Sequence, residues 1–339
     1  MNIVYCGALW EGSTALMRLE ALRTLGHKVR GVDSACHLSG LRGGLVRWIR
    51  RSGYHPDSTG LNRRLLEAIV DRVPDLVWID KGLVVAPATL RTISATGVRV
   101  LHYSPDDMSG RHNQSWQYLR SIPLYDVHVT TKSFNVPELK RMGARSVVFV
   151  NKAFCSKTHR PIEIGAEQRD LFGGPVGFIG GFERQRADSI KFLVEHGLPV
   201  RIWGGGKWDS WARSTRTPKL TVENRPLWGN DYAVAVCSFD ICLGFLRKLN
   251  RDLQTARSIE IPACGTFLLA ERTAEHTGMF EEGVEAEFFG SDEELLEKCR
   301  YYLDNPVRRE RIARSGRLRC LNGHYSYEAH MESALKCFE

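Results

Sequence analysis

The chain alternates short apolar runs with helix-like segments along most of its length, and this alternation constrains the fold most strongly. Ile3–Cys6 is a strand-like run, a helical pattern covers 14–25, and a second strand-like run covers 29–32. The pattern starts again with the apolar run at 175–179. Strands that alternate with helices build parallel sheets with helices on both faces. We therefore expect an α/β protein with two Rossmann-like domains in series.

The domain boundaries follow from where the alternation is interrupted. Residues 151–174 contain Pro161, several charges and little periodicity, which is typical of a linker. We expect an N-terminal α/β domain over 1–150, a linker over 151–174 and a C-terminal α/β domain over 175–322. The remaining residues, 323–339, are expected to form a helix that packs back on the first domain.

Composition narrows the class of protein. The 339 residues are 43% hydrophobic and 25% charged, which is typical of a globular protein, and no apolar run approaches the ~20 residues of a membrane span. The first residues lack the basic start and apolar stretch of a secretory signal. Nine cysteines without a Cys-x-x-Cys pair fit reduced thiols. We expect a cytoplasmic protein.

The net charge of +8 favours anionic partners: nucleotide diphosphates, acidic lipid headgroups or nucleic acid. Residues 34–56 contain no acidic residue but four arginines, Arg42, Arg47, Arg50 and Arg51. A helix over 45–51 would carry apolar side chains on one side and Arg47, Arg50 and Arg51 on the other. Such a segment can lie on an anionic membrane. The alternative is a helix that packs on its own domain with a solvated basic face.

The run Arg257–Ala270 predicts a short helix that ends at Gly265 and continues into a buried strand. This unit would place Glu260 on a helix beside the crevice where α/β folds bind ligands. An ionised carboxylate can accept hydrogen bonds from two neighbouring sugar hydroxyls. The alternative is that Glu260 is a solvated helix residue.

The same run, together with Phe280–Ala286, Ser291–Leu295 and Tyr302–Pro306, resembles the C-terminal half of CgeB-like glycosyltransferases, of the GT-B, family-4-like group. The resemblance is strong from about Gly174 onward and weaker over 75–161. It implies a hexosyltransferase-type enzyme that moves a sugar from a nucleotide-diphosphate sugar to an unidentified acceptor (a glycan, a lipid-linked molecule, a protein or nucleic acid). It also implies that the two domains face each other across a cleft, with an acceptor-binding domain over 1–150 and a nucleotide-sugar-binding domain over 175–322. Retention of configuration and the absence of a cofactor are implied as well.

In this group, a glutamate of the motif holds the ribose of the donor, and Glu260 stands in its place. Many relatives have an earlier glutamate eight positions before it, where this chain has Asp252. The side chain of Asp252 is shorter by one methylene, and this residue could equally cap the following helix.

The donor diphosphate needs cationic groups and a backbone that allows close approach. Gly180 and Gly181 lie between a predicted strand and a predicted helix, followed by Arg184 and Arg186. A guanidinium group matches phosphate in geometry, and the resemblance places an arginine at about the position of Arg186. The alternative is a glycine turn with two exposed arginines.

Two further segments could contact the donor. Lys248 and Arg251 precede the Glu260 helix, and the sequence does not rank them against each other or against a solvated charge run. Gly204 and Gly205 end another predicted strand and could pass close to the base or ribose, with Trp208 as a packing or stacking residue.

On the acceptor side, Asp106 and Asp107 follow a predicted strand of the first domain, and Glu11–Ser13 follows another. One aspartate could act as general base if the enzyme inverts configuration. If it retains configuration, as the resemblance suggests, the leaving phosphate can take the proton and the aspartates would bind acceptor hydroxyls. The alternative is that Pro105–Asp107 is only a turn.

Missing motifs argue against several other classes. The chain contains no Asp-x-Asp triplet, which favours a metal-independent mechanism, and no Gly-x-Gly-x-x-Gly, Walker A or Gly-x-Ser-x-Gly motif. Two alternatives stay open: a sugar-nucleotide epimerase of similar two-domain plan, and a nucleic-acid-associated protein that glycosylates or binds DNA bases.

Overall fold

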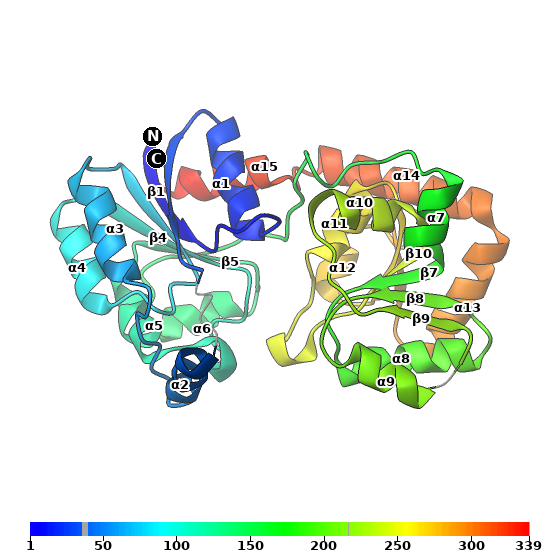
Figure 1. Ribbon diagram of the computed structural model, residues 1–339. Coiled ribbons are helices and arrows are strands. Elements are labelled where there is room, and N and C mark those ends of the chain that lie inside the picture. Colours follow the sequence, from blue (N-terminus) through cyan, green and yellow to red (C-terminus); the bar gives the residue numbers. More distant parts are fainter. Residues whose placement is uncertain (36–39, 216, 339) are drawn as a thin grey trace. The chain divides into compact units, whose positions relative to one another are not determined.

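The structure is a computed structural model that describes residues 1–35, 40–215 and 217–338, without the side chains of 40–43 and 47 (Figure 1). It contains two compact units, one formed by Met1–Asn151 with Tyr327–Glu339 and one by Lys152–Ser326. Each unit has a six-stranded sheet of parallel strands with helices on both faces. The expected α/β class with two Rossmann-like sheets is therefore confirmed.

The sheet of the first unit has the strand order β2-β1-β3-β4-β5-β6. All five residues of β3, Leu-Val-Trp-Ile-Asp, are buried, because helices cover both faces of this central strand. The strands are β1 (Asn2–Gly7), β2 (Lys28–Asp33), β3 (Leu76–Asp80), β4 (Arg99–Ser104), β5 (Val127–Thr130) and β6 (Val147–Phe149).

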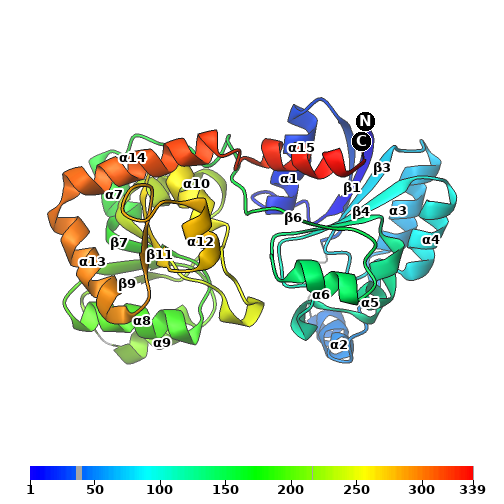
Figure 2. The same cartoon turned by 180° about the vertical axis from the view of Figure 1, so that it is seen from behind.

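The helices of the first unit divide between the two faces of its sheet. Helices α3 and α4 pack on one face, while α1 and the last helix, α15, lie side by side on the other (Figures 1 and 2). The segment 323–339 thus contributes α15 to this unit. The helices are α1 (Thr14–Thr24), α2 (Gly40–Arg50), α3 (Leu61–Val70), α4 (Pro87–Ala95), α5 (Trp116–Ser121), α6 (Asn135–Arg141) and α15 (Tyr327–Leu335), with short 3-10 turns at Arg111–Asn113, Ile122–Leu124 and Lys336–Phe338.

A buried ion pair joins these elements. Arg18 of α1 pairs with Asp80 at the end of β3, and both side chains are buried. The Asp80 carboxylate also accepts hydrogen bonds from the Tyr5 hydroxyl and the Trp78 indole, both at 3.0 Å. The Arg18 guanidinium lies over two further rings, 4.4 Å from the centroid of Tyr103 and 5.8 Å from that of Tyr327. The pair therefore connects three strands with the first and last helices.

The sheet of the second unit has the strand order β12-β11-β10-β7-β8-β9. Its strands are β7 (Gly174–Ile179), β8 (Val200–Trp203), β9 (Leu220–Glu223), β10 (Phe239–Gly244), β11 (Phe267–Glu271) and β12 (Glu287–Phe289). Gly265 has φ +77°, the left-handed conformation that glycine favours, and it separates α11 from β11 as the sequence predicts.

Helices cover both faces of the second sheet as well. One core lies between the sheet and α10 and α11, and the other between the sheet and α8 and α13. The helices are α7 (Ala166–Phe172), α8 (Arg184–Glu195), α9 (Trp208–Thr215), α10 (Gly229–Cys237), α11 (Arg257–Ala263), α12 (Ala274–Met279), α13 (Asp292–Asp304) and α14 (Pro306–Asn322), with a 3-10 turn at Lys248–Asn250.

The segment 151–174 is not a free linker, which corrects the expectation from the sequence. From Lys152 onward it belongs to the second unit, and it contains α7. The buried Phe154 donates its backbone N–H to the carbonyl of Tyr325 at 3.0 Å, and Phe172 stacks on Trp203 with ring centroids 5.4 Å apart. Two aromatic anchors therefore fix a segment whose polar composition suggested a linker.

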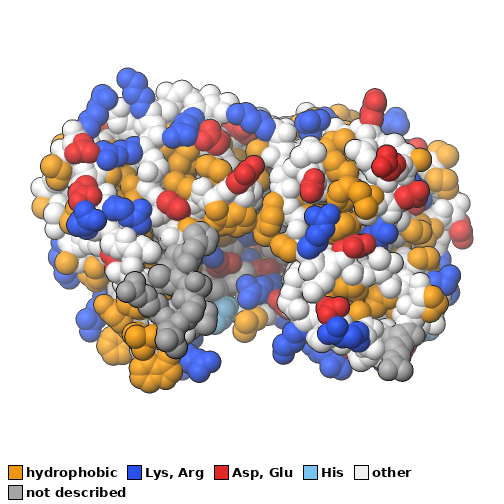
Figure 3. Space-filling model, in the orientation of Figure 1, with side chains coloured by type: hydrophobic (Ala, Val, Ile, Leu, Met, Phe, Trp, Pro, Cys, Tyr) orange, Lys and Arg blue, Asp and Glu red, His pale blue; other side chains and the backbone are white. Residues whose placement is uncertain are grey.

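Helix α2 is only partly packed on the first unit. Val46 and Ile49 are half-buried, but Leu45 and Trp48 are 59% and 68% exposed. The expected single apolar side is thus divided between the domain and solvent, and Figure 3 shows hydrophobic and basic side chains over this helix. The side chain of Arg47 lies outside the described residues. Across the described ranges, no helix combines the length and the apolar character needed to span a bilayer.

We predict that Arg18→Met lowers the stability of the first unit by about 3–5 kcal/mol, because it leaves the Asp80 carboxylate buried without a cation. Hydrogen exchange of the β1 and β3 amides measures this free energy. Arg23→Met is the matched control: Arg23 forms an exposed ion pair with Glu20 at 2.8 Å on the same helix, which should contribute less than about 1 kcal/mol. Equal effects of the two changes would contradict the prediction.

Candidate functional site

The order of strands locates a crevice in the second unit. From β7 the chain continues to β8 and β9 on one side of the sheet, whereas β10 pairs with β7 on the other side. The loops after β7 and β10 therefore leave the carboxyl edge of the sheet in opposite directions. Such a switch point is the usual ligand site of open α/β sheets. The predicted donor residues lie in these loops, in the loop after the neighbouring β8, or on the helices that follow.

The two glycine loops pack directly against each other. A Cβ atom added to Gly204 would lie 2.0 Å from the carbonyl oxygen of Gly180, so no other residue fits there. The same carbonyl accepts a hydrogen bond from the indole of Trp208 at 2.8 Å, and Trp208 is fully buried. Trp208 is therefore a packing residue, whereas Gly205 has open space around it. Close backbone approach holds the loops after β7 and β8 together.

Arg186 connects the two loops of the switch point. It lies in the first turn of α8 and is 5% exposed. Its Nε donates to the carbonyl of Leu246 at 3.3 Å, and its Nη1 donates to the carbonyl of Gly181 at 3.0 Å. Burial, followed by the charge of Arg257, lowers the pKa of Arg186 to about 10. Arg186 thus positions the loops that flank the crevice, a role that the sequence did not reveal.

Arg257 is a cation that the sequence analysis did not select. It begins α11, and its guanidinium carbon lies 5.9 Å from the ring centroid of Phe178; that of Arg186 lies 5.8 Å from the same ring. The Nε of Arg257 is buried, and no group in the described part of the chain accepts its hydrogen bond. Two neighbouring guanidinium groups and an unpartnered buried donor fit an anionic ligand.

Glu260 follows Arg257 by one helical turn and is 7% exposed. The alternative interpretation, in which Glu260 is a solvated helix residue, is therefore wrong. Its Oε2 accepts a hydrogen bond from the Tyr232 hydroxyl at 2.8 Å, and its Oε1 lies 3.8 Å from Nε2 of His159. Burial lowers the pKa of His159, although the charge of Glu260 acts in the opposite direction. A carboxylate offers about four acceptor positions, so Glu260 can still accept from ligand hydroxyls.

Arg184 and Lys248, which were also predicted to bind the diphosphate, form ion pairs with carboxylates of the protein. Arg184 lies on α8, not in the loop, and forms an exposed ion pair with Asp188 at 3.0 Å. Lys248 pairs with the carboxylate of Glu271. The latter also accepts the backbone N–H of Leu246 at 2.6 Å. Lys248 therefore stabilises the loop after β10.

Arg251 and Asp252 end the same loop. Arg251 is exposed and adopts φ +48°, a left-handed conformation that is uncommon for this residue type. The carboxylate of Asp252 accepts a hydrogen bond from the Asn250 amide at 2.7 Å. It does not cap the following helix, whose N-cap is Ala256.

The first unit has its own switch point, between β1 and β3. After β1, Ser13 caps α1 by accepting the backbone N–H of Leu16 at 3.1 Å. After β3, Lys81 adopts φ +61° and forms an ion pair with Asp106 at 2.5 Å. A strained non-glycine residue at a strand end is a frequent feature of functional sites. The structure thus brings Asp106 to the crevice edge together with Lys81, which the sequence analysis did not select.

Asp107 lies next to Asp106 but is buried, and its carboxylate accepts hydrogen bonds from backbone N–H groups. Its Oδ1 accepts hydrogen bonds from the N–H groups of Ser109 and Gly110, both at 3.1 Å, and from the Asn135 amide at 2.9 Å. These contacts hold the turn, in agreement with the alternative that Pro105–Asp107 has a structural role. Among the side chains that the structure describes, no three His, Cys, Asp or Glu residues are grouped so that they could hold a metal ion.

Comparisons with known proteins agree with this architecture. Residues 184–336 match the family model described as glycosyl transferase-like. Similar solved structures include HepE of Anabaena in complex with UDP and glucose, with 12% identity, a TM-score of 0.66 and coverage of 100% of this chain and 99% of that chain. No relative was found among curated proteins.

Two further structures are similar over the whole chain. Sucrose-phosphate synthase of Thermosynechococcus elongatus has 12% identity, a TM-score of 0.70 and coverage of 100% and 98%. A glycosyltransferase from Rickettsia africae has 13% identity, a TM-score of 0.65 and coverage of 99% and 97%. The chain therefore has the GT-B fold, and its C-terminal part is similar to the glycosyl transferase-like family.

We predict different effects of alanine at two adjacent glycines. Gly204→Ala would place a methyl group against the Gly180 carbonyl and should destabilise the second unit by about 1–3 kcal/mol. Gly205→Ala enters open space and should stay within about 0.5 kcal/mol of the wild type. Urea unfolding of both variants measures the difference, and an equal response would show that the two loops are not in close contact.

Proposed function

We propose that this protein is a CgeB-like glycosyltransferase that transfers a hexose from a nucleotide-diphosphate sugar to an acceptor bound by the first unit. The observation that carries the proposal is Arg257, whose buried Nε has no partner among the described residues and which lies beside Arg186 and one turn before Glu260. The family match over 184–336 supports it. So do the solved complexes of HepE with UDP and with UDP-glucose.

Each group in the second unit would have a distinct role. Arg257 would bind the diphosphate and stabilise the charge that develops as it leaves. Arg186 would position the two loops around it, and the glycine loops would allow the donor to approach the backbone. Glu260, held by Tyr232, would accept hydrogen bonds from the ribose hydroxyls.

We propose a retaining, metal-independent transfer in the cytoplasm. The bond between the anomeric carbon and the diphosphate oxygen breaks, and a new bond forms between that carbon and an acceptor hydroxyl oxygen on the same face. The hydroxyl proton passes to the departing phosphate, so no protein base is required. Asp106, held by Lys81, would then bind and orient acceptor hydroxyls.

A sugar-nucleotide epimerase is the second candidate. A putative UDP-N-acetylglucosamine 2-epimerase of Listeria monocytogenes shares the fold, with 11% identity and a TM-score of 0.59. An epimerase converts the donor without any acceptor. Product analysis after incubation with nucleotide sugars alone therefore separates the two activities.

We predict that Glu260→Gln weakens nucleotide-sugar binding about tenfold to a hundredfold. The amide has one acceptor oxygen, so one charged hydrogen bond of roughly 1.5–3 kcal/mol is lost or mismatched. The amide oxygen can still accept from Tyr232, so the fold should persist. Calorimetric titration measures the affinity, and Glu297→Gln on the surface of α13 is the control. Unchanged affinity of Glu260→Gln would remove this residue from the site.

We also predict that EDTA leaves turnover unchanged. The expectation rests on the missing Asp-x-Asp triplet. Loss of activity with EDTA that Mn²⁺ or Mg²⁺ restores would contradict a metal-independent mechanism.

We propose further that α2 brings the first unit to anionic membranes. Exposed Leu45 and Trp48 can enter the interface while Arg47, Arg50 and Arg51 contact acidic headgroups.

Changing the three arginines to Gln should weaken binding to anionic vesicles at least tenfold, because each contributes about 1 kcal/mol near such a surface. Sedimentation with vesicles measures this, with Arg91→Gln on α4 as control. Equal sedimentation of the triple variant and the control would show that the basic face is only solvated.

A further inference from the structure

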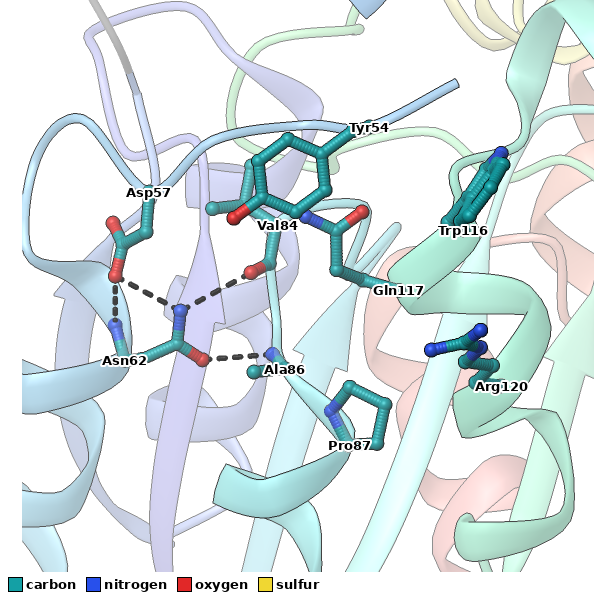
Figure 4. A pocket seen from close by; sticks show the side chains of 9 residues that line it. All are labelled: Tyr54, Asp57, Asn62, Val84, Ala86, Pro87, Trp116, Gln117 and Arg120. Carbon is teal, nitrogen blue, oxygen red and sulfur yellow. Dashed lines mark hydrogen bonds between the residues drawn. The ribbon is translucent and has the colours of Figure 1, made fainter. Parts of the chain in front are cut away.

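A pocket of about 360 Å³ opens in the first unit, apart from the groups proposed to bind the donor (Figure 4). Three segments form it, and they follow β2, β3 and β4 in the chain, at the carboxyl edge of the sheet. Its lining residues are Tyr54, Asp57, Asn62, Val84, Ala86, Pro87, Trp116, Gln117 and Arg120. Its size is within the range of small-molecule sites.

One wall of the pocket is fixed by hydrogen bonds between its own residues. The Asp57 carboxylate accepts the backbone N–H groups of Leu61 and Asn62 at 2.7 and 2.8 Å. The Asn62 amide donates to the carbonyl of Val84 at 3.1 Å and accepts the N–H of Ala86 at 2.8 Å, as Figure 4 shows. Burial would raise the pKa of Asp57, but the donated hydrogen bonds outweigh it and lower this pKa. The wall is thus preformed, and the charge of Asp57 is already solvated by the chain.

Two aromatic rings line the other side and remain uncovered. Trp116 is 56% exposed and Tyr54 is 50% exposed, and both rings stand at the pocket in Figure 4. The backbone N–H of Trp116 donates to the carbonyl of Gly53 at 2.8 Å, and the Gln117 side chain forms two hydrogen bonds with the backbone of His55. The segment that carries Tyr54 is therefore fixed to α5. Rigid, exposed aromatic surface favours a ligand with an apolar face.

The charge beside these rings is positive. The guanidinium carbon of Arg120 lies 5.8 Å from the ring centroid of Trp116, and this arginine has no acidic partner in the described part of the chain. Arg50, at the end of α2, is close enough that its charge adds to burial in lowering the pKa of His55. The pocket therefore combines flat apolar surfaces with a guanidinium group that can bind an acid in bidentate fashion.

We propose that this pocket binds the acceptor, and that the acceptor is a sugar that carries an acidic group, a carboxylate or a phosphate. A pyranose ring has an apolar C–H face that can pack on Trp116, and its hydroxyls can reach Tyr54 and Gln117. The acidic group would pair with Arg120. The role of this sugar as acceptor rests on the proposed transfer, whereas its binding to the pocket does not.

Titration of the full chain with glucuronic acid, glucose 6-phosphate and glucose, followed by saturation-transfer NMR, tests the proposal. We expect the acidic sugars to bind at least tenfold more tightly than glucose, since a charged hydrogen bond contributes roughly that factor. Arg120→Gln should remove this difference, and Trp116→Ala should weaken all three sugars about tenfold. Arg91→Gln and Trp228→Ala, at exposed positions elsewhere, are the matched controls.

The relative affinities for the three sugars decide whether the pocket binds an acidic sugar. Tighter binding of only one acidic sugar supports the proposal and identifies the group as carboxylate or phosphate. Equal binding of glucose and both acidic sugars, or variants that behave like their controls, would overturn it. The same variants should keep their affinity for nucleotide sugars. A chain that binds acidic sugars but no nucleotide sugar would contradict the proposed transfer and leave the pocket assignment intact.

Discussion

The site depends on one constraint, which is that parallel strands all end at the same edge of their sheet. In the second unit this edge brings together the loops after β7, β8 and β10, which are distant in sequence. Close backbone contacts and a buried arginine hold these loops together. Gly180 and Gly204 meet backbone to backbone, and Arg186 donates to the carbonyl groups of Gly181 and Leu246 from a buried position. The Nη2 of Arg186 also lies 3.8 Å from the carboxylate of Glu183, so carbonyl groups and one carboxylate hold this buried guanidinium beside the crevice.

Different neighbours keep Arg257 and Glu260, which we propose bind one ligand, from pairing with each other. They lie one turn apart on α11, but Glu260 has Tyr232 and His159 as neighbours, whereas the Nε of Arg257 has no partner among the described residues. In the proposed site, the two groups would therefore present opposite charges to different parts of the ligand. A nucleotide diphosphate needs this pattern, because its diphosphate is anionic and its ribose hydroxyls are donors.

The sequence predicted β1, α1, β2 and β7 and the unit of α11 and β11, because their apolar residues recur with the period of a strand or a helix. It did not predict α7, which lies in the segment interpreted as a linker and has no buried residue. Phe154 and Phe172 show why the linker prediction was wrong. These two aromatic side chains are enough to fix a polar segment, but they change the average composition of that segment very little. Local pattern placed Glu260 on a helix and the glycine loops at strand ends, but their proposed binding roles came from the family resemblance. The orientation of the Arg186 and Arg257 side chains depends on Phe178 and on the loop after β10, so it could not be inferred from the sequence. The left-handed backbone of Lys81 depends on tertiary packing and could not be inferred either.

Hydrogen exchange with and without nucleotide sugars tests whether the switch point of the second unit binds the donor. The full chain is incubated with UDP-, GDP-, ADP- and dTDP-sugars, and the exchange of peptides from both units is compared with that of the free protein. We predict that the matching donor protects 180–186 and 245–260 in the second unit, where the two loops of the switch point meet. Protection confined to the first unit, or no protection with any of the four nucleotides, would contradict it.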